Sequence, residues 1–214
     1  SHLKMVGALV FFQVKLKTLL DNLISETISG EDAQKELLQM VKDYKLNLFM
    51  DFDKFAKAND NKKISLLMNA LNRPFRILGV VKNEGEPGGG PFYVLVDGLP
   101  TVSIVEKDEL RTSEQVAMMT QGEYFNPVDI AFSSLDIHGE PFQNLTPFVD
   151  EGRCFVVEKT DKQTGQMVRR MEHPGLWNGA MGRVNSITVE LPIETFGPVK
   201  EVNDLITKKQ HNSN

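Results

Sequence analysis

The 214-residue chain has 41% hydrophobic and 25% charged residues, as is typical of a soluble globular protein. Its net charge of −5 argues against nucleic acid as a partner, because phosphate contacts need clustered Lys and Arg. The one cysteine, Cys154, excludes an internal disulfide and fits a reducing, cytoplasmic compartment. Since no run approaches the roughly 18 apolar residues of a membrane span, we expect no membrane partner either.

The first third of the chain has the apolar spacing of helices, over residues 3–24, 31–49 and 62–71. Ser29 followed by Asp32 predicts an N-cap for the second helix, and Pro74 predicts that the third has ended. Residues 1–72 are therefore expected to form a helical lead-in. Because an apolar helix begins almost at Leu3, we expect a preceding half of the same protein; whether Ser1 and His2 are native is left open.

From Phe75 onward, short β-rich runs alternate with turns, which predicts an α/β (α+β) fold with a mixed sheet and flanking helices over residues 73–214. The segment Asp97-Gly98-Leu99-Pro100 predicts a hairpin turn. Further helices are expected near residues 113–119, 177–181 and 201–208. The predicted strands cover residues 75–81, 92–96, 101–105, 128–132, 154–158 and 186–191.

A glycine-rich loop at residues 82–92 follows the first of these strands. Three consecutive glycines, Gly88, Gly89 and Gly90, remove every Cβ from part of the loop and allow a ligand to approach the backbone closely. The alternative is a flexible surface turn. Pro87 and Pro91 stiffen the segment, so we favour a rigid loop that faces a ligand.

Metal and nucleophile motifs are weak in this sequence. The four histidines show no ligand spacing with one another or with the cysteine, so no metal site is predicted. The acidic pair Asp51 and Asp53 flanks one aromatic residue, a pattern that arises often by chance. Cys154 lies in an apolar run and is expected to be a core residue rather than a nucleophile.

Three polar side chains occupy positions suited to a binding crevice. Glu106 directly follows an apolar strand, and Asn126 directly precedes another. Lys200 follows Pro198 at the expected start of a helix, a position that favours anions. Taken alone, each position is also consistent with a solvated surface residue.

The segment at residues 196–200, Phe-Gly-Pro-Val-Lys, followed by Asp204 and Leu205, resembles the F-x-P-V-K-x-x-x-D-L segment of UDP-sugar pyrophosphorylases of the UTP–glucose-1-phosphate uridylyltransferase type. This resemblance implies that Lys200 contacts the phosphates of a nucleotide sugar. It also implies a chain that resembles the C-terminal half of a nucleotidyltransferase GT-A-like fold.

Three more segments follow the order found in the pyrophosphorylases. Residues 104–110 look like the family's V-E-Y-S-E-I segment, which implies that Glu106 binds sugar hydroxyls. Asn126 is similar to an asparagine in the next sugar-binding strand. The loop Gly88 to Gly90 falls where the family has a glycine that contacts the sugar.

Longer stretches closely resemble a bacterial family described as a domain of unknown function (forty-three-oh-one). The stretches are NRPFRILGVVKNEGEPGGGPF, YFNPVD, HPGLWNGAMG and ETFGPVK, and the likeness covers nearly the full chain. The pyrophosphorylases carry their nucleotide-binding glycine loop and metal-binding aspartate in a half that precedes this region. The resemblance therefore implies a Mg²⁺ cofactor with ligands mostly outside this chain.

These resemblances imply the C-terminal part of a nucleotidyltransferase-like protein. It would convert a sugar 1-phosphate and a nucleoside triphosphate into a nucleotide sugar and pyrophosphate, and this chain alone would be inactive. The implied partners are a nucleotide sugar or sugar 1-phosphate and the preceding half of the protein. The alternative is a non-catalytic domain that binds a nucleotide sugar or another protein.

Overall fold

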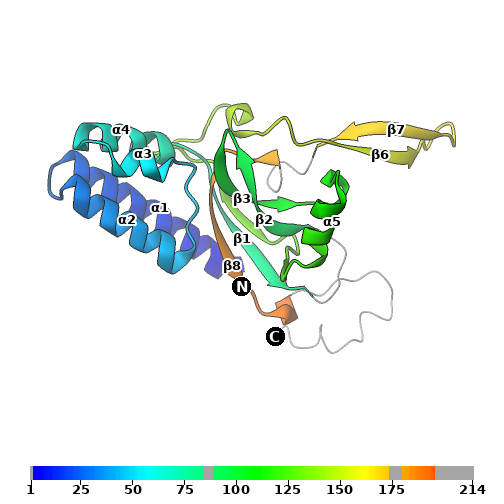
Figure 1. Ribbon diagram of the computed structural model, residues 1–214, viewed down its shortest axis with the longest axis horizontal. Coiled ribbons are helices and arrows are strands. Elements are labelled where there is room, and N and C mark those ends of the chain that lie inside the picture. Colours follow the sequence, from blue (N-terminus) through cyan, green and yellow to red (C-terminus); the bar gives the residue numbers. More distant parts are fainter. Residues whose placement is uncertain (1, 84–88, 174–179, 196–214) are drawn as a thin grey trace.

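The computed structural model describes residues 2–83, 89–173 and 180–195. A layer of helices lies at one end of the molecule, a mixed sheet occupies the middle, and a two-stranded hairpin projects from the other end (Figure 1). This arrangement confirms the expected α+β fold with a helical N-terminal third.

The helical layer contains α1 (His2–Ile24), α2 (Gly30–Tyr44), the short α3 (Phe52–Ala56) and α4 (Asp60–Leu71). The predicted cap is confirmed, since the Ser29 side chain accepts a hydrogen bond from the Asp32 amide. However, α2 ends five residues before the expected Phe49, because Lys45 adopts the left-handed conformation with φ of 53°. The apolar residues that follow are still buried, but in an extended segment where Asn47 bridges Ser186.

The acidic pair that resembled a metal motif has a local structural role. Asp51 is the N-cap of α3, and its side chain accepts a hydrogen bond from the amide of Lys54. Asp53 lies in the first turn of the same helix, where a negative charge is favourable. Capping thus accounts for Asp51, and a favourable charge at the helix N-terminus accounts for Asp53.

The central strand of the mixed sheet is β1 (Phe75–Lys82), which is buried over Phe75 to Val81. It pairs in parallel with β8 (Asn185–Glu190) and antiparallel with β4 (Tyr124–Phe125) and β5 (Ile130–Ser133). The sheet is therefore mixed, as the apolar run of β1 predicted.

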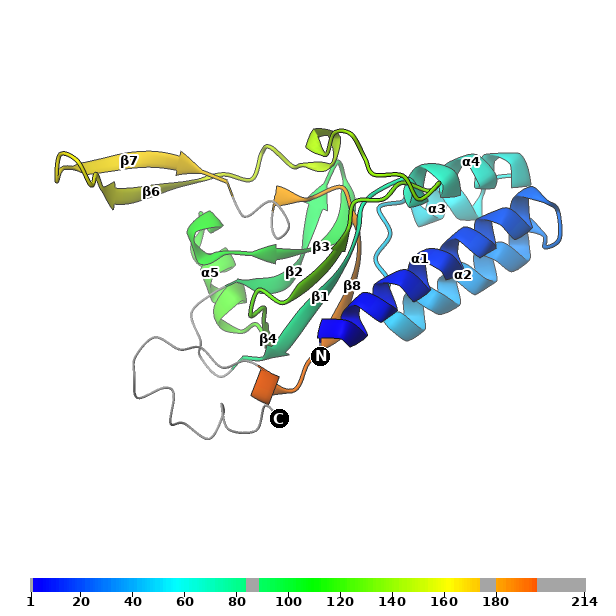
Figure 2. The ribbon, with the colours of Figure 1, turned by 180° about the vertical axis from the view of Figure 1, so that it is seen from behind.

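A second sheet consists of β2 (Gly90–Val96) and β3 (Leu99–Val105). Asp97 and Gly98 join the strands with φ angles of 52° and 78°, the combination that a tight hairpin turn requires, so the expected hairpin is confirmed. After β3 come the short helix η1 (Lys107–Glu109) and α5 (Ser113–Thr120), which lies beside this sheet (Figure 2).

The projecting hairpin consists of β6 (Phe155–Thr160) and β7 (Met167–Glu172), and it extends away from the body (Figure 2). The short helix η2 (Thr146–Phe148) precedes it, and η4 (Ile193–Thr195) follows β8. Cys154 lies at the base of this hairpin and is half-buried. The expectation of a core cysteine was wrong, because its apolar run enters a strand that projects out of the body.

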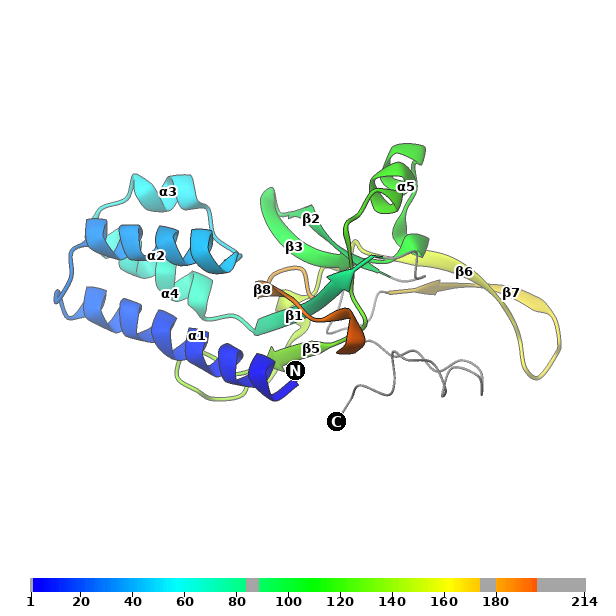
Figure 3. The same ribbon diagram turned by 90° about the horizontal axis from the view of Figure 1, so that it is seen from below.

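One hydrophobic core joins the helices to the sheet, with α1 running along the layer that β1 and β5 form (Figure 3). Leu20, Leu37 and Leu67 of the helices and Ile77 and Ile187 of the sheet belong to the same buried cluster. Among the described helices, none has the length and apolar content needed to span a membrane.

Candidate functional site

A bulge separates β4 from β5 opposite the middle of β1. The Asn126 side chain occupies it: its Nδ2 donates to the Gly79 carbonyl at 2.6 Å, and its Oδ1 accepts from the Val128 amide at 3.1 Å. The Gly79 amide in turn donates to the Asp129 carbonyl at 2.8 Å. A Cβ on Gly79 would lie 2.9 Å from that carbonyl oxygen, so the close approach requires glycine.

Within this bulge, Val128 has a φ of 62°, which is strained for a β-branched residue. The hydrogen bond from its amide to the Asn126 side chain holds the turn in this conformation. Asn126 itself is buried, with a relative exposure of 2%. The asparagine therefore holds the bulge in shape, and its predicted contact with a sugar stays a prediction.

The described part of the glycine loop packs against the chain itself. The carbonyl of Gly89 accepts a hydrogen bond from the backbone amide of Asn126 at 2.9 Å. A Cβ on Gly89 would lie 2.6 Å from Ile104 Cγ2. A Cβ on Gly90 would lie 3.0 Å from the Tyr124 carbonyl oxygen. The absence of a side chain at both glycines thus leaves room for the neighbouring strands. Their predicted contact with a sugar stays a prediction.

Glu106 lies directly next to this packed loop. It is half-buried at the end of β3, and a Cβ on Gly89 would lie 3.5 Å from Glu106 Cγ. Burial, followed by the negative charges of Glu109 and Asp108, raises the pKa of the Glu106 carboxyl group, while the positive charge of Arg153 opposes this shift. The carboxylate therefore lies in an environment that favours hydrogen-bond donors, such as sugar hydroxyls.

An ion pair beneath Glu106 fixes the segment that follows β3. Arg153 Nε donates to Glu109 Oε2 and Arg153 Nη2 to Glu109 Oε1, both at 2.7 Å, and the side chains are only 10% and 8% exposed. Glu109 Oε1 also accepts the Glu106 amide at 2.8 Å. The same guanidinium donates to Ser103 Oγ at 2.6 Å and to the Ile104 carbonyl at 2.9 Å.

A second arginine lies on β1, fully buried. Arg76 Nε donates to Ser186 Oγ and Arg76 Nη2 to the Val102 carbonyl, each at 3.0 Å. Burial and the positive charge of Arg153 lower the pKa of Arg76 to about 9, so the guanidinium still carries its charge at neutral pH. Two cationic groups therefore bind carbonyl or hydroxyl groups of β3 just before Glu106.

Three of the predicted site positions, Gly89, Glu106 and Asn126, thus lie together although they come from separate segments. Gly90 adjoins them at the start of β2, while Gly88 and Lys200 lie outside the described residues. Two cavities beside α1 and α4 have other residues as their lining, so this cluster is separate from both.

The chemistry available in this cluster is hydrogen bonding and charge rather than nucleophilic attack. A carboxylate such as that of Glu106 can accept hydrogen bonds from hydroxyl groups, and Glu109, which is paired with Arg153, binds the Glu106 backbone amide. Within the described ranges, no group of three or more His, Cys, Asp or Glu side chains is placed to hold a metal ion. The described residues thus offer no cluster of carboxylates for the Mg²⁺ that the resemblance implies.

A family model described as "Domain of unknown function (DUF4301)" matches residues 2–212. The chain belongs to this family. The likeness that the four quoted stretches indicated is thereby confirmed. No curated protein matches the chain.

Sequence analysis missed Glu109, Arg153 and Arg76 as residues of this region. Arg76 had one usable signal, because an arginine inside an otherwise apolar strand must find buried acceptors. Glu109 and Arg153 are 44 residues apart and carry no shared motif. Only the fold reveals that they pair.

Proposed function

We propose that this chain supplies the sugar-binding part of a nucleotidyltransferase-like protein related to the UDP-sugar pyrophosphorylases. The observation that carries the proposal is the meeting of Gly89, Glu106 and Asn126 at one end of the sheets. These positions were selected from separate sequence motifs, and a single small ligand must touch all its binding residues at once. Their proximity supports a common site.

In the proposed reaction, a phosphate oxygen of a sugar 1-phosphate attacks the α-phosphorus of a nucleoside triphosphate. The bond from the α-phosphorus to the oxygen that bridges it to the β-phosphorus breaks, and pyrophosphate leaves. Mg²⁺ held by the preceding half would neutralise phosphate charge. The contribution of this chain is positioning: Glu106 orients the sugar through its hydroxyls, and Lys200 holds a phosphate.

The half-buried position of Glu106 gives the sugar contact its strength. When a site is built to accept a hydroxyl proton, removal of the acceptor leaves the ligand group unpaired, at a cost of about 1.5–3 kcal/mol. The Glu109–Arg153 pair keeps the Glu106 backbone in place while Glu106 is replaced. Because Glu106 is also the N-cap of η1, Glu106→Gln, which keeps the size of the side chain, is compared with Glu106→Ala to separate loss of the contact from a change in the cap.

The test is calorimetric titration of the chain, and of the protein with its preceding half, with UDP-glucose, UDP-galactose and glucose 1-phosphate. We expect Glu106→Ala to lower the affinity for at least one of these ligands by about tenfold to a hundredfold. Glu36→Gln, which alters an exposed carboxylate on α2, serves as the control and should bind as the parent does. Equal affinities of parent and Glu106→Ala for every ligand that binds would reject the proposal.

One observation favours a second candidate, a domain that binds another protein. The hairpin of β6 and β7 projects from the body and exposes Val156, Met167 and Met171, at 57%, 64% and 68%. Their register places Val156 opposite Met171, so they share one face of the ribbon. Binding of no nucleotide sugar by the intact protein, together with capture of a partner that Met171→Lys abolishes, would support this second function.

A further inference from the structure

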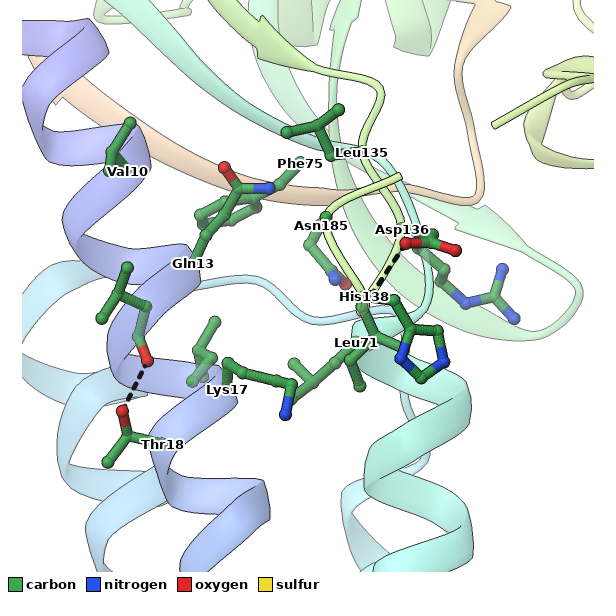
Figure 4. A pocket seen from close by; sticks show the side chains of 15 residues that line it. Val10, Gln13, Lys17, Thr18, Leu71, Phe75, Leu135, Asp136, His138 and Asn185 are labelled. Carbon is green, nitrogen blue, oxygen red and sulfur yellow. Dashed lines mark hydrogen bonds between the residues drawn. The ribbon is translucent and has the colours of Figure 1, made fainter. Parts of the chain in front are cut away.

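A cavity of about 440 Å³ lies between α1 and the turn at residues 135–139, far along the chain from the proposed sugar site. The end of α4 and the start of β1 close it from behind, through Leu71 and Phe75 (Figure 4). Its volume is within the range of sites that hold small organic ligands. Neither the predicted function nor the family match accounts for it.

One side of the cavity is apolar. Val10 of α1 and Leu135 lie on different sides of the cavity (Figure 4), and Val14, Phe75 and Leu71 add further apolar lining. Val10 and Val14 are 53% and 61% exposed, so this wall is open to an incoming molecule. A ligand with an apolar body would cover surface that is now in contact with water.

Most neutral polar groups that line the cavity already bind protein atoms. Gln13 Nε2 donates to Ser133 Oγ at 2.9 Å, and Asn185 Nδ2 donates to the Ala70 carbonyl at 2.8 Å. The hydroxyl of Thr18 donates to a carbonyl one turn earlier on α1, at 2.9 Å. These groups shape the wall and have little capacity left for a ligand.

Two cationic side chains, Lys17 and Arg73, line the cavity together with the imidazole ring of His138, and the acidic side chain there is Asp136. Asp136 Oδ1 already accepts the amides of His138 and Glu140, at 2.8 and 2.9 Å, and these bonds, that of Glu140 first, lower the pKa of its carboxyl group. The Asp136 carboxylate therefore stabilises the turn that contains it.

Lys17 retains donors that a ligand can use, and Arg73 adds a positive charge to the lining. Lys17 pairs with Asp21 one turn along α1, but both side chains are about half exposed, and such pairs contribute little. Arg73 Nη1 and Nη2 bind acceptors, while its buried Nε has no acceptor among the described residues. Figure 4 shows Lys17 extending from α1 towards the side that carries Leu71 and His138.

We propose that this cavity binds a small organic monoanion with an apolar body. The anionic group contacts Lys17, His138 and Arg73, and the apolar body lies against Val10 and Val14. The chemistry follows from the two sides of the cavity: an apolar wall open to solvent, and a cationic edge whose acid is already bound to backbone amides.

The test uses 1-anilinonaphthalene-8-sulfonate as a fluorescent probe of the 214-residue chain, with decanoate and its neutral analogue decanol as competitors. We expect decanoate to displace the probe at least about tenfold more effectively than decanol does. The double variant Lys17→Met with His138→Gln should remove this preference and leave displacement by decanol unchanged. Lys35→Met, an exposed lysine of α2 paired with Glu31, is the matched control and should keep the preference.

A second variant tests the cavity rather than its charge. Val14→Trp adds a large group at an exposed position of α1, so the fold should persist while both competitors lose affinity. Equal displacement by decanoate and decanol from the parent chain would overturn the proposal. It would equally fail if the preference for decanoate survived the double variant, or if Val14→Trp left the affinity of both competitors unchanged.

Discussion

Arg153 and Glu109 form a nearly buried ion pair in which two nitrogens of the guanidinium each bind a different carboxylate oxygen at 2.7 Å. The pair connects the segment before β6 to the short helix after β3, and Glu109 also binds the backbone of Glu106. The hairpin that projects into solvent and the proposed sugar-binding residue are therefore joined through one carboxylate.

Replacing Glu109 with Gln should lower the free energy of unfolding by about 3–5 kcal/mol, because it leaves the charge of Arg153 buried without this carboxylate. Urea denaturation followed by circular dichroism measures this. Glu31→Gln, which breaks an exposed pair with Lys35, should change it by less than about 0.5 kcal/mol. Similar losses in the two variants would contradict the importance of burial here.

Val128→Gly should stabilise the protein by about 0.5–1 kcal/mol. The left-handed conformation of Val128 costs a residue with a Cβ about 1–2 kcal/mol, which outweighs the backbone entropy cost of about 0.5–1 kcal/mol for glycine. The side chain is 75% exposed, so little packing is lost. Val128→Ala retains the Cβ and is the control, with almost no expected gain in stability. Thermal melting compares the parent with both variants. Equal stabilities of the parent and Val128→Gly would show that the turn is unstrained.

Glu106→Gln should leave the fold as stable as the parent, or make it more stable, at neutral pH. The pKa of Glu106 is raised in the folded state, so between its ordinary value and the raised value the folded protein binds more protons than the unfolded one. The free energy of unfolding of the parent therefore falls as pH rises through that window, whereas that of the variant does not show this decrease. Urea denaturation from pH 4 to 8 measures the difference; a variant that loses stability relative to the parent as pH rises would contradict the assigned shift.

Lys200→Met should weaken glucose 1-phosphate or nucleotide-sugar binding by about tenfold, because it removes a charge-assisted contact with phosphate. Lys35→Met on α2 serves as the control and should bind as the parent does. Calorimetry on the 214-residue chain, and on the chain joined to the proposed preceding half, is the measurement. If Lys200→Met binds every such ligand with the affinity of the parent, the phosphate role inferred from the pyrophosphorylase resemblance is wrong.

Much of the fold could be predicted because periodicity and turn residues are local signals. The cap at Ser29 and the turn at Asp97 and Gly98 are recognisable from a few letters. The strands β4 and β7 were missed: β4 has two residues, and β7, Met-Val-Arg-Arg-Met-Glu, has no buried face to impose an alternating pattern. The end of α2 was misplaced because residues 46–50 stay apolar for burial beside the sheet.

Much less of the candidate site could be predicted. Motifs selected Glu106, Asn126 and Gly89, which lie together, but the sequence gives no sign that Asn126 is needed to hold a bulge. A structural role of this kind depends on contacts between segments that are distant in the sequence. The same limit applies to Arg153, whose partner is 44 residues away.

The pairing of β1 with β8 has a consequence for synthesis of the protein. Arg76 and Ser186 are 110 residues apart, and one edge of the buried central strand is completed only by β8. Until the ribosome has released β8, the helices and β5 can assemble, but that edge of β1 remains open to pairing with other chains. We therefore expect a chain cut before Asn185, which leaves that edge of β1 unpaired, to aggregate more readily than the full chain.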